Sequence, residues 1–242
     1  EHFDIHGGGI DLIFPHHENE IAQSEGATGK QFVNYWLHCQ HLIVNGRKMS
    51  KSLGNFYTLH DLSSYTPRSV RMIFLSAHYG EELNFTFDAL AQAQKTLDKF
   101  DDFVRKLKDV KSGAEDKSIA KLIAETKSKI IAALDNDLNT PIAWATIFDF
   151  MKKINASIDA GKLGKTDAEK VIAFLKEIDS IFSIFEFEFQ DSIGPELLEL
   201  LEKRKKAKNE KNYAEADRLR AILLGKGISV ADTKEGQRWK RI

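Results

Sequence analysis

Two histidines and two glutamates lie within the five consecutive positions from His16 to Glu20, directly after Pro15. If this segment is helical, His16 and Glu20 are four residues apart and share one face. His17 then points about 100° away, toward apolar neighbours. An imidazole and a carboxylate on one face can supply half of a tetrahedral zinc site. An ordinary exposed helix pair has the same spacing, so the spacing alone leaves both interpretations open.

Three glycines, Gly7 to Gly9, precede this cluster, and Asp11 follows them. Residues 3–5 are typical of a short strand, so His6 and the glycines are expected to form the loop that follows it. Glycines at such a place let a ligand approach the backbone, as in nucleotide-binding crevices beyond the carboxyl ends of strands. Asp11 could there hold ribose hydroxyls, although three glycines are also compatible with a plain turn.

Residues 47–55 read RKMSKSLGN. Lys48 and Lys51, with two serines and a glycine close behind, predict a mobile cationic loop suited to a triphosphate. Ammonium groups there would stabilise the negative charge that develops on departing pyrophosphate. A solvated basic turn is the alternative for any loop rich in lysine and serine.

The elements that must position these residues follow from periodicity and from the placement of proline and glycine. Strands are expected at 42–44 and 47–49 around the turn Asn45-Gly46, and a small hairpin pairs 228–230 with 238–240. Helices are predicted at 15–25, 67–74, 87–110, 115–135, 141–159, 166–187, 195–208 and 213–225. All eight histidines precede residue 79, which places the chemistry in the first third of the chain.

Composition limits the classes of protein. The 242 residues carry a formal net charge of −1, so global charge does not indicate a nucleic-acid partner. The one cysteine, Cys39, excludes an internal disulfide and fits a reducing compartment, and we expect its thiol to be buried and inert. No apolar run approaches the roughly 18 residues of a membrane span. Because the chain begins at Glu1 rather than Met, we expect it to be a fragment.

The tail has a different balance of charge. Between Glu196 and Ile242 there are 13 Lys or Arg against 8 Asp or Glu, and residues 203–206 are four consecutive cations. Basic groups can position a phosphate backbone, and an exposed indole such as Trp239 can stack on an unpaired base. Charge runs are also typical of solvated helix faces, and Trp239 could equally cap a small core.

The string KMSKS at residues 48–52 resembles the signature of class I aminoacyl-tRNA synthetases without a mismatch. Together with FDIHGGGIDLIFPHHENEIAQSE and WLH, it resembles the cysteinyl-tRNA synthetase family. The resemblance extends along the whole chain to ADRLRAILLGKGI and the terminal RWKR. The front motifs are highly specific, whereas the helical middle matches in type and order.

The resemblance implies a mostly α chain with a small α/β part. Residues 1–60 would be the C-terminal part of a Rossmann-type catalytic domain, and 61–86 a connecting stem-contact region. Residues 87–190 would form an α-helical bundle that binds tRNA, and 195–242 a small α+β anticodon-binding domain.

The resemblance also implies site residues. In this family two cysteines, a histidine and a glutamate hold a zinc ion that binds the substrate thiolate, and the last two correspond to His16 and Glu20. The cysteines and the HIGH motif lie upstream and are absent from this sequence. Lys48 and Lys51 would be the catalytic residues and would also bind the nucleotide. The other nucleotide-binding residues would be Gly9, Asp11, His6 and His38. Gln40 stands where the family usually has a glycine, near the expected adenine pocket.

The implied activity is a two-step ligation in the cytoplasm. Cysteine and ATP, with Mg2+, give cysteinyl-adenylate, and the acyl group moves to tRNA(Cys), with no membrane involved. Zinc suits this substrate, because a pocket discriminates near-isosteres poorly whereas only sulfur ionises readily and binds zinc strongly. The alternatives are the related cysteine ligase of mycothiol synthesis, which lacks the C-terminal domain, and a noncatalytic RNA- or metal-binding fragment.

Overall fold

The computed structural model describes residues 2–113, 115–189, 195–233 and 236–241. The chain divides into two compact units, Glu1–Phe187 and Glu188–Ile242, and each is described by itself. None of the described helices is long and apolar enough to cross a bilayer.

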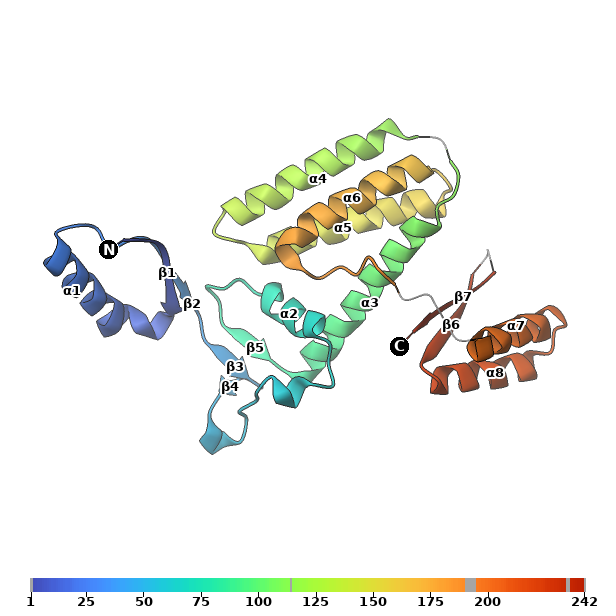
Figure 1. Ribbon diagram of the computed structural model, residues 1–242, viewed down its shortest axis with the longest axis horizontal. Helices are drawn as coiled ribbons and strands as arrows, with labels where there is room; N and C mark the ends of the chain where they lie inside the picture. Colours follow the sequence, from blue (N-terminus) through green and yellow to red (C-terminus); the bar gives the residue numbers. More distant parts are fainter. Residues whose placement is uncertain (1, 114, 190–194, 234–235, 242) are drawn as a thin grey trace. The chain divides into compact units, whose positions relative to one another are not determined.

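A β-α-β element opens the first unit (Figure 1). Strand β1 (Phe3–Gly9) pairs in parallel with β2 (Val33–Cys39). Between them come two short turns, η1 (Ile10–Leu12) and η2 (Ile13–His17), and helix α1 (Glu18–Thr28). Because the two strands run in the same direction, their carboxyl ends lie at the same edge of the sheet, and the crossover connects them.

Both predicted boundaries of this element were wrong. The glycines are not a loop, because their backbone pairs in register with Leu37, His38 and Cys39 and extends β1 to Gly9. The helix does not stop at Gly26 but continues to Thr28. It ends where Gly29 adopts φ +65°, a left-handed conformation that glycine accepts without strain.

A three-stranded sheet follows, in the order β4 (Arg47–Lys48), β3 (Leu42–Val44) and β5 (Leu83–Phe85). The predicted turn is confirmed: Asn45 and Gly46 have φ 50° and 70° and join the antiparallel strands β3 and β4. Strand β5 was not predicted. Helix α2 (Pro67–Ser76) begins at Pro67, where the side chain of Thr66 accepts the Ser69 N–H.

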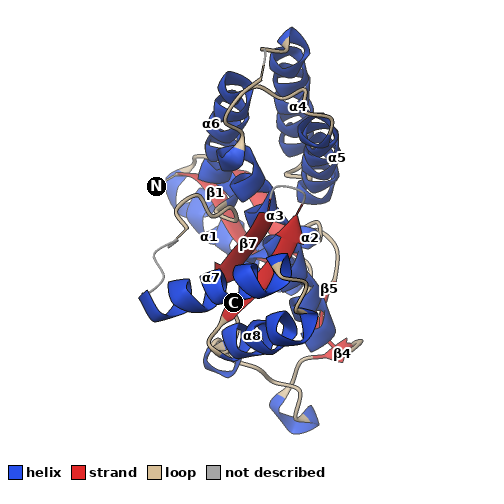
Figure 2. Cartoon of the chain, turned by 90° about the vertical axis from the view of Figure 1, so that its right-hand side faces the viewer, coloured by secondary structure: helices blue, strands red, loops and turns tan. Residues whose placement is uncertain are grey.

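Four longer helices form a bundle, seen from two directions in Figures 1 and 2. They are α3 (Phe87–Asp109), α4 (Lys117–Asp135), α5 (Thr140–Asp159) and α6 (Lys165–Phe182). Their apolar stripes meet in a core in which Phe100, Ile147 and Leu175 are fully buried. The predicted extension of α6 to residue 187 was wrong. Ser183 is left-handed, and the Asp179 carboxylate instead accepts the Ile184 and Phe185 N–H groups.

The second unit pairs two helices, α7 (Pro195–Asn209) and α8 (Tyr213–Gly225), with a hairpin of β6 (Ile228–Thr233) and β7 (Gly236–Arg241). The predicted hairpin is confirmed, with Val230 opposite Trp239. Trp239 is partly buried against a small apolar core. The core residues are Leu201, Leu223, Ile228 and Val230.

The four consecutive cations of α7 do not form one exposed face. Arg204 is only 2% exposed, and its guanidinium donates to both oxygens of Asp232, at 3.1 and 3.0 Å. Lys203 pairs with Glu199 one turn earlier. The local sequence suggested a solvated or RNA-binding run, but Arg204 is part of the unit's own interior.

Candidate functional site

Strands β1 and β2 and the segment η2 together carry a cluster of rings, which we call the histidine cluster: His6, His16, His17, Trp36 and His38. In the strand register His6 lies opposite Trp36, and Gly8 lies opposite His38. Trp36 and His38 share one face of β2, because alternate residues of a strand point the same way. Their rings stack with an interplanar angle of 4°. The edge at the carboxyl ends of parallel strands is where open α/β sheets bind ligands.

His17 is the centre of the cluster. It is 3% exposed, its Nδ1 lies 2.8 Å from Nε2 of His38, and its ring lies 4.8 Å from that of Trp36. Burial lowers the pKa of His17, and the positive charges that His38 and His6 could carry lower it further. His17 is therefore neutral at pH 7. Its predicted orientation away from the exposed face is confirmed, but its neighbours are histidines and Trp36.

The carboxylate of Glu20 lies close to two imidazole rings. Nε2 of His16 lies 3.6 Å from one carboxylate oxygen, and Nε2 of His6 lies 3.2 Å from the other. The second oxygen, Oε2, is buried and makes no hydrogen bond of acceptable geometry, despite the nearby imidazole. Ligand atoms around a tetrahedral zinc lie about 3.3 Å apart. Each separation is close to that value, although the two imidazoles approach different oxygens of Glu20. The orphaned oxygen is the one beside His6, and a cation there would satisfy it. The donor types and these spacings fit zinc.

A second possible ligand group contains His17 in place of His16. One ligand atom from each of His6, His17 and Glu20 lies within 4.8 Å of the others. That set would have to contract to reach tetrahedral spacing, whereas the His16–Glu20 pair is already close to it. The structure therefore brings His6 into the neighbourhood of the predicted pair, a contact that no local spacing in the sequence indicates.

Zinc binding gives a first prediction. Residues 1–242 alone should bind zinc weakly, because two or three protein ligands seldom retain it. A longer protein, in which this chain is joined to a segment that supplies the remaining ligands, should bind zinc stoichiometrically. Glu20→Gln should abolish binding in both, since the carboxylate is the group that both imidazoles approach. Competition with a coloured chelator measures this, and Glu18→Gln, on an exposed neighbour, is the control. Undiminished zinc binding in Glu20→Gln would remove this carboxylate from the site.

The triple glycine makes room for side chains of the chain itself. A Cβ on Gly8 would lie 2.7 Å from Cε1 of His17, and a Cβ on Gly9 would lie 2.4 Å from an oxygen of Asp11. Neither glycine has a positive φ. At Gly8 the close approach of the buried His17 ring, rather than backbone conformation, favours glycine. At Gly9 the close atom belongs to the exposed side chain of Asp11, which can move aside. The carboxylate of Asp11 lies against Gly9, the last residue of β1.

The loop at residues 47–55 is held by its polar side chains. Ser50 accepts the Leu53 N–H and begins the turn η3 (Lys51–Leu53), and Gly54 ends it at φ +66°. Asn55 closes the loop by accepting the Ser50 N–H at 2.9 Å and donating to the Lys48 carbonyl at 3.1 Å. Both lysines remain exposed.

Lys51 lies over the ring of Phe56, with Nζ 5.6 Å from the ring centroid. Such a contact contributes about 0.5–1 kcal/mol at an exposed site, which a phosphate can readily outcompete. The structure thus places Lys48 and Lys51 on one exposed loop. It places His6, His16 and His38 in the histidine cluster, with Glu20 beside it.

Two features of this region were not predicted correctly. Cys39 is exposed rather than buried, because it ends an edge strand of a two-stranded sheet. Trp36 was not considered as a site residue. Its spacing of two from His38 in a strand is the signal that would have identified it.

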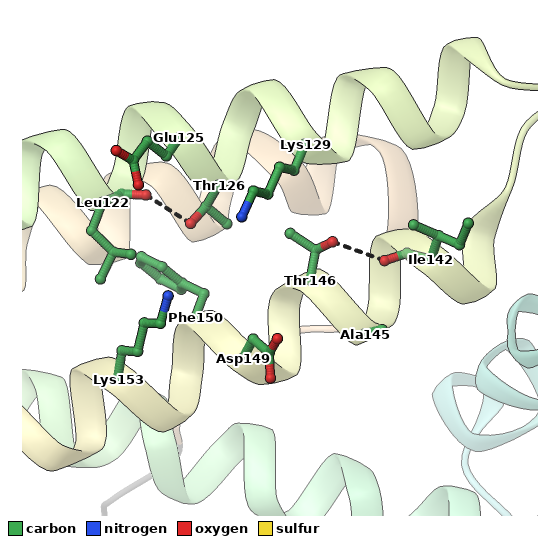
Figure 3. Close-up of a pocket in the computed structure, with 10 residues that line it drawn as sticks. All are labelled: Leu122, Glu125, Thr126, Lys129, Ile142, Ala145, Thr146, Asp149, Phe150 and Lys153. Carbon is green, nitrogen blue, oxygen red and sulfur yellow. Dashed lines mark hydrogen bonds between the residues drawn. The ribbon is translucent and has the colours of Figure 1, made fainter.

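A pocket of about 190 Å³ lies between α4 and α5, well away from these residues in sequence (Figure 3). Two threonines in its wall are already bonded to backbone carbonyls, Thr126 to Leu122 and Thr146 to Ile142. Its lining contains as many basic as acidic residues: Lys129 and Lys153 against Glu125 and Asp149. We assign it no ligand.

Three family models match successive parts of the chain. Residues 1–95 match the family model of the class I (C) tRNA synthetase catalytic domain. Residues 129–190 match the DALR domain, and residues 191–239 match the cysteinyl-tRNA ligase anticodon-binding domain.

Similar proteins agree with these matches. Cysteine–tRNA ligases of Protochlamydia amoebophila and Brachyspira hyodysenteriae are each 41% identical over the whole of this chain. The chain spans about half the length of these relatives, 51% and 52%. A similar solved structure is the crystal structure of an Agrobacterium radiobacter LeuRS in a ternary complex with tRNA and LeuAMS. The alignment covers 75% of this chain and 26% of the LeuRS chain, with a TM-score of 0.60 and 17% sequence identity. That likeness shows the fold alone.

Proposed function

Because this chain belongs to the cysteinyl-tRNA synthetase family of class I synthetases, we propose that the protein containing it activates cysteine with ATP and transfers it to tRNA(Cys). The observation that carries this proposal is the succession of three matched domains. A catalytic domain, a DALR domain and an anticodon-binding domain follow one another in a single chain, an arrangement that suits both chemistry and RNA recognition.

In this proposal His16 and Glu20 are two protein ligands of a zinc ion, and His6 lies beside them. When bound, the zinc supplies a soft Lewis acid that prefers a thiolate over a hydroxyl. The orphaned oxygen of Glu20 supports this assignment. His17 is bonded to His38 and packs on Trp36, and its lowered pKa keeps a further positive charge away from the metal.

The nucleotide would lie between the strand edge and the cationic loop. We propose that Asp11 and Gly9 contact the ribose side of ATP, and that Lys48 and Lys51 contact its phosphates together with Mg2+. His6 and His38 would complete this pocket. Nε2 of His38 is engaged by His17, which leaves Nδ1 for the base. The reaction would take place in the cytoplasm, where tRNA is charged.

The ligase of mycothiol synthesis is the second candidate, since it shares the front motifs. The match of residues 191–239 to an anticodon-binding domain favours the tRNA ligase. A noncatalytic RNA- or metal-binding protein is the third candidate.

One experiment separates these possibilities. The longer protein should catalyse cysteine-dependent ATP–pyrophosphate exchange and charge tRNA(Cys). Deleting residues 196–242 should leave the exchange nearly intact and lower charging through weaker tRNA binding, because in this proposal the tail binds RNA and contributes no residue to the adenylate site. Exchange without any charging by the undeleted protein would favour the amino-sugar ligase, and the absence of exchange would favour the noncatalytic protein.

A further inference from the structure

The turn between α4 and α5 docks against the segment that joins α2 to β5, and the site described above does not use this contact. Asp137 and Leu138 are both left-handed, with φ 57° and 53°. Non-glycine residues keep this conformation only where their surroundings hold them, and such positions often mark functional segments. At the far side of the turn, the hydroxyl of Thr140 donates to the Ala77 carbonyl at 3.4 Å.

Two side chains of the docking segment hold Asp137. The Gly80 N–H donates to Nδ1 of His78 at 3.1 Å, so the proton of the neutral ring is on Nε2, which donates to the Asp137 carbonyl at 2.7 Å. The Tyr79 hydroxyl donates to the Asp137 carboxylate. This hydrogen bond, followed by burial, raises the pKa of Tyr79, so the phenol remains a donor at neutral pH.

The backbone of Tyr79 faces a different element. Its carbonyl accepts the N–H of Gln40 at 2.9 Å. Gln40 directly follows the last residue of β2, two positions after His38, whose ring is bonded to His17. One residue therefore contacts the bundle through its side chain and the end of an active-site strand through its main chain.

Helix α2 makes further contacts with the bundle. Arg68 forms a bidentate pair with Asp101 of α3, at 3.2 and 2.7 Å, and Arg71 donates to the Phe182 carbonyl at the end of α6 at 2.6 Å. These contacts fix α2 on the bundle and involve no residue of β2. Holding the α4–α5 turn next to the end of β2 is a separate task.

We propose that Tyr79 and Asp137 form a coupling joint that holds the helical bundle in register with the end of β2. This inference rests on the proposed function, in which the bundle side binds tRNA and His38 lines the site where cysteine is activated. The joint touches neither substrate. Tyr79 and Asp137 are positioning residues that place bound tRNA relative to the activated amino acid.

The test uses the longer protein with Tyr79→Phe, Asp137→Asn and the double substitution. Asparagine retains the tolerance for a left-handed backbone, so the turn keeps its shape. Loss of a charge-assisted hydrogen bond should slow single-turnover transfer from preformed adenylate to tRNA by about 10-fold. Pyrophosphate exchange and tRNA affinity should stay within about twofold, because neither needs the two sides in register. The double substitution should be no slower than either single one.

Tyr65→Phe is the matched control, since it makes the same chemical change in the same unit at a hydroxyl that has no partner among the described contacts. Equal transfer rates in Tyr79→Phe and Tyr65→Phe would overturn the joint. An equal loss of exchange and transfer in Tyr79→Phe would also overturn it, because that is the result expected of a purely structural role. Should Asp137→Asn prove unstable in thermal melting, Tyr79→Phe still decides. A wild-type protein that neither exchanges nor charges would overturn the proposed function, and the joint with it.

Discussion

Replacing Lys51 by alanine should lower the rate of cysteine activation by about 10²-fold or more in the longer protein, because its ammonium would meet the charge that develops on departing pyrophosphate. Cysteine affinity should change little, since we assign it to the zinc side of the site. Rapid-quench measurement of adenylate formation gives the rate, and equilibrium binding gives the affinity.

Two controls test whether this effect belongs to the loop. Lys99→Ala removes an exposed lysine of α3 and should leave activation unchanged. Phe56→Leu removes the ring beneath Lys51 and should change the rate by no more than about fivefold, because an exposed cation–π contact contributes only about 0.5–1 kcal/mol. A Lys51→Ala enzyme with normal single-turnover activation and weakened cysteine binding would remove the lysine from this role.

Replacing Asp232 by alanine should destabilise the C-terminal unit by about 3 kcal/mol, because it leaves the guanidinium of Arg204 buried without its carboxylate. Gln237 would still accept from Arg204 at 2.6 Å, but an amide does not neutralise the charge. In so small a unit this loss is a large part of the total stability. Hydrogen exchange of the amides of α7, α8 and the hairpin measures it in the intact chain.

Matched variants separate the buried cation from the surface pair. Lys208 also approaches Asp232, at 2.9 Å, but its side chain is 41% exposed, so Lys208→Met should cost less than about 1 kcal/mol. Arg204→Met removes the charge and keeps the bulk, and should cost less than Asp232→Ala. If Asp232→Ala were no more destabilising than Lys208→Met, the buried pair would not be what holds this unit together.

The same carboxylate gives the unit a dependence on pH. Hydrogen bonds from Arg204 and then Lys208 lower the pKa of Asp232 from 3.8 to about 2. A folded-state pKa below the unfolded value means that this contribution is fully present above pH 4. It is lost as the pH falls toward 2, because the unfolded chain then binds the proton more readily. In Asp232→Asn this part of the acid sensitivity should disappear.

The sequence alone indicated which residues to consider for chemistry, because that information is local. A separation of four residues in a helix places His16 beside Glu20, and the structure shows this contact. The turn Asn45-Gly46 demands a left-handed backbone, and the helical periods follow from apolar stripes, so these elements were also predictable. The run KMSKSLGN and the order of the later segments were sufficient to indicate the family.

Only the tertiary structure decided which distant residues meet. His17 contacts His38 across 21 residues, Arg204 contacts Asp232 across 28, and Tyr79 contacts Asp137 across 58. Periodicity reports which face of an element is buried, but it carries no record of what packs against that face. For this reason a cation in a basic run proved to be interior, a cysteine expected inside proved to be exposed, and His6 was found beside Glu20. Strand pairing and helix packing bring these side chains together, and they depend on the whole chain at once.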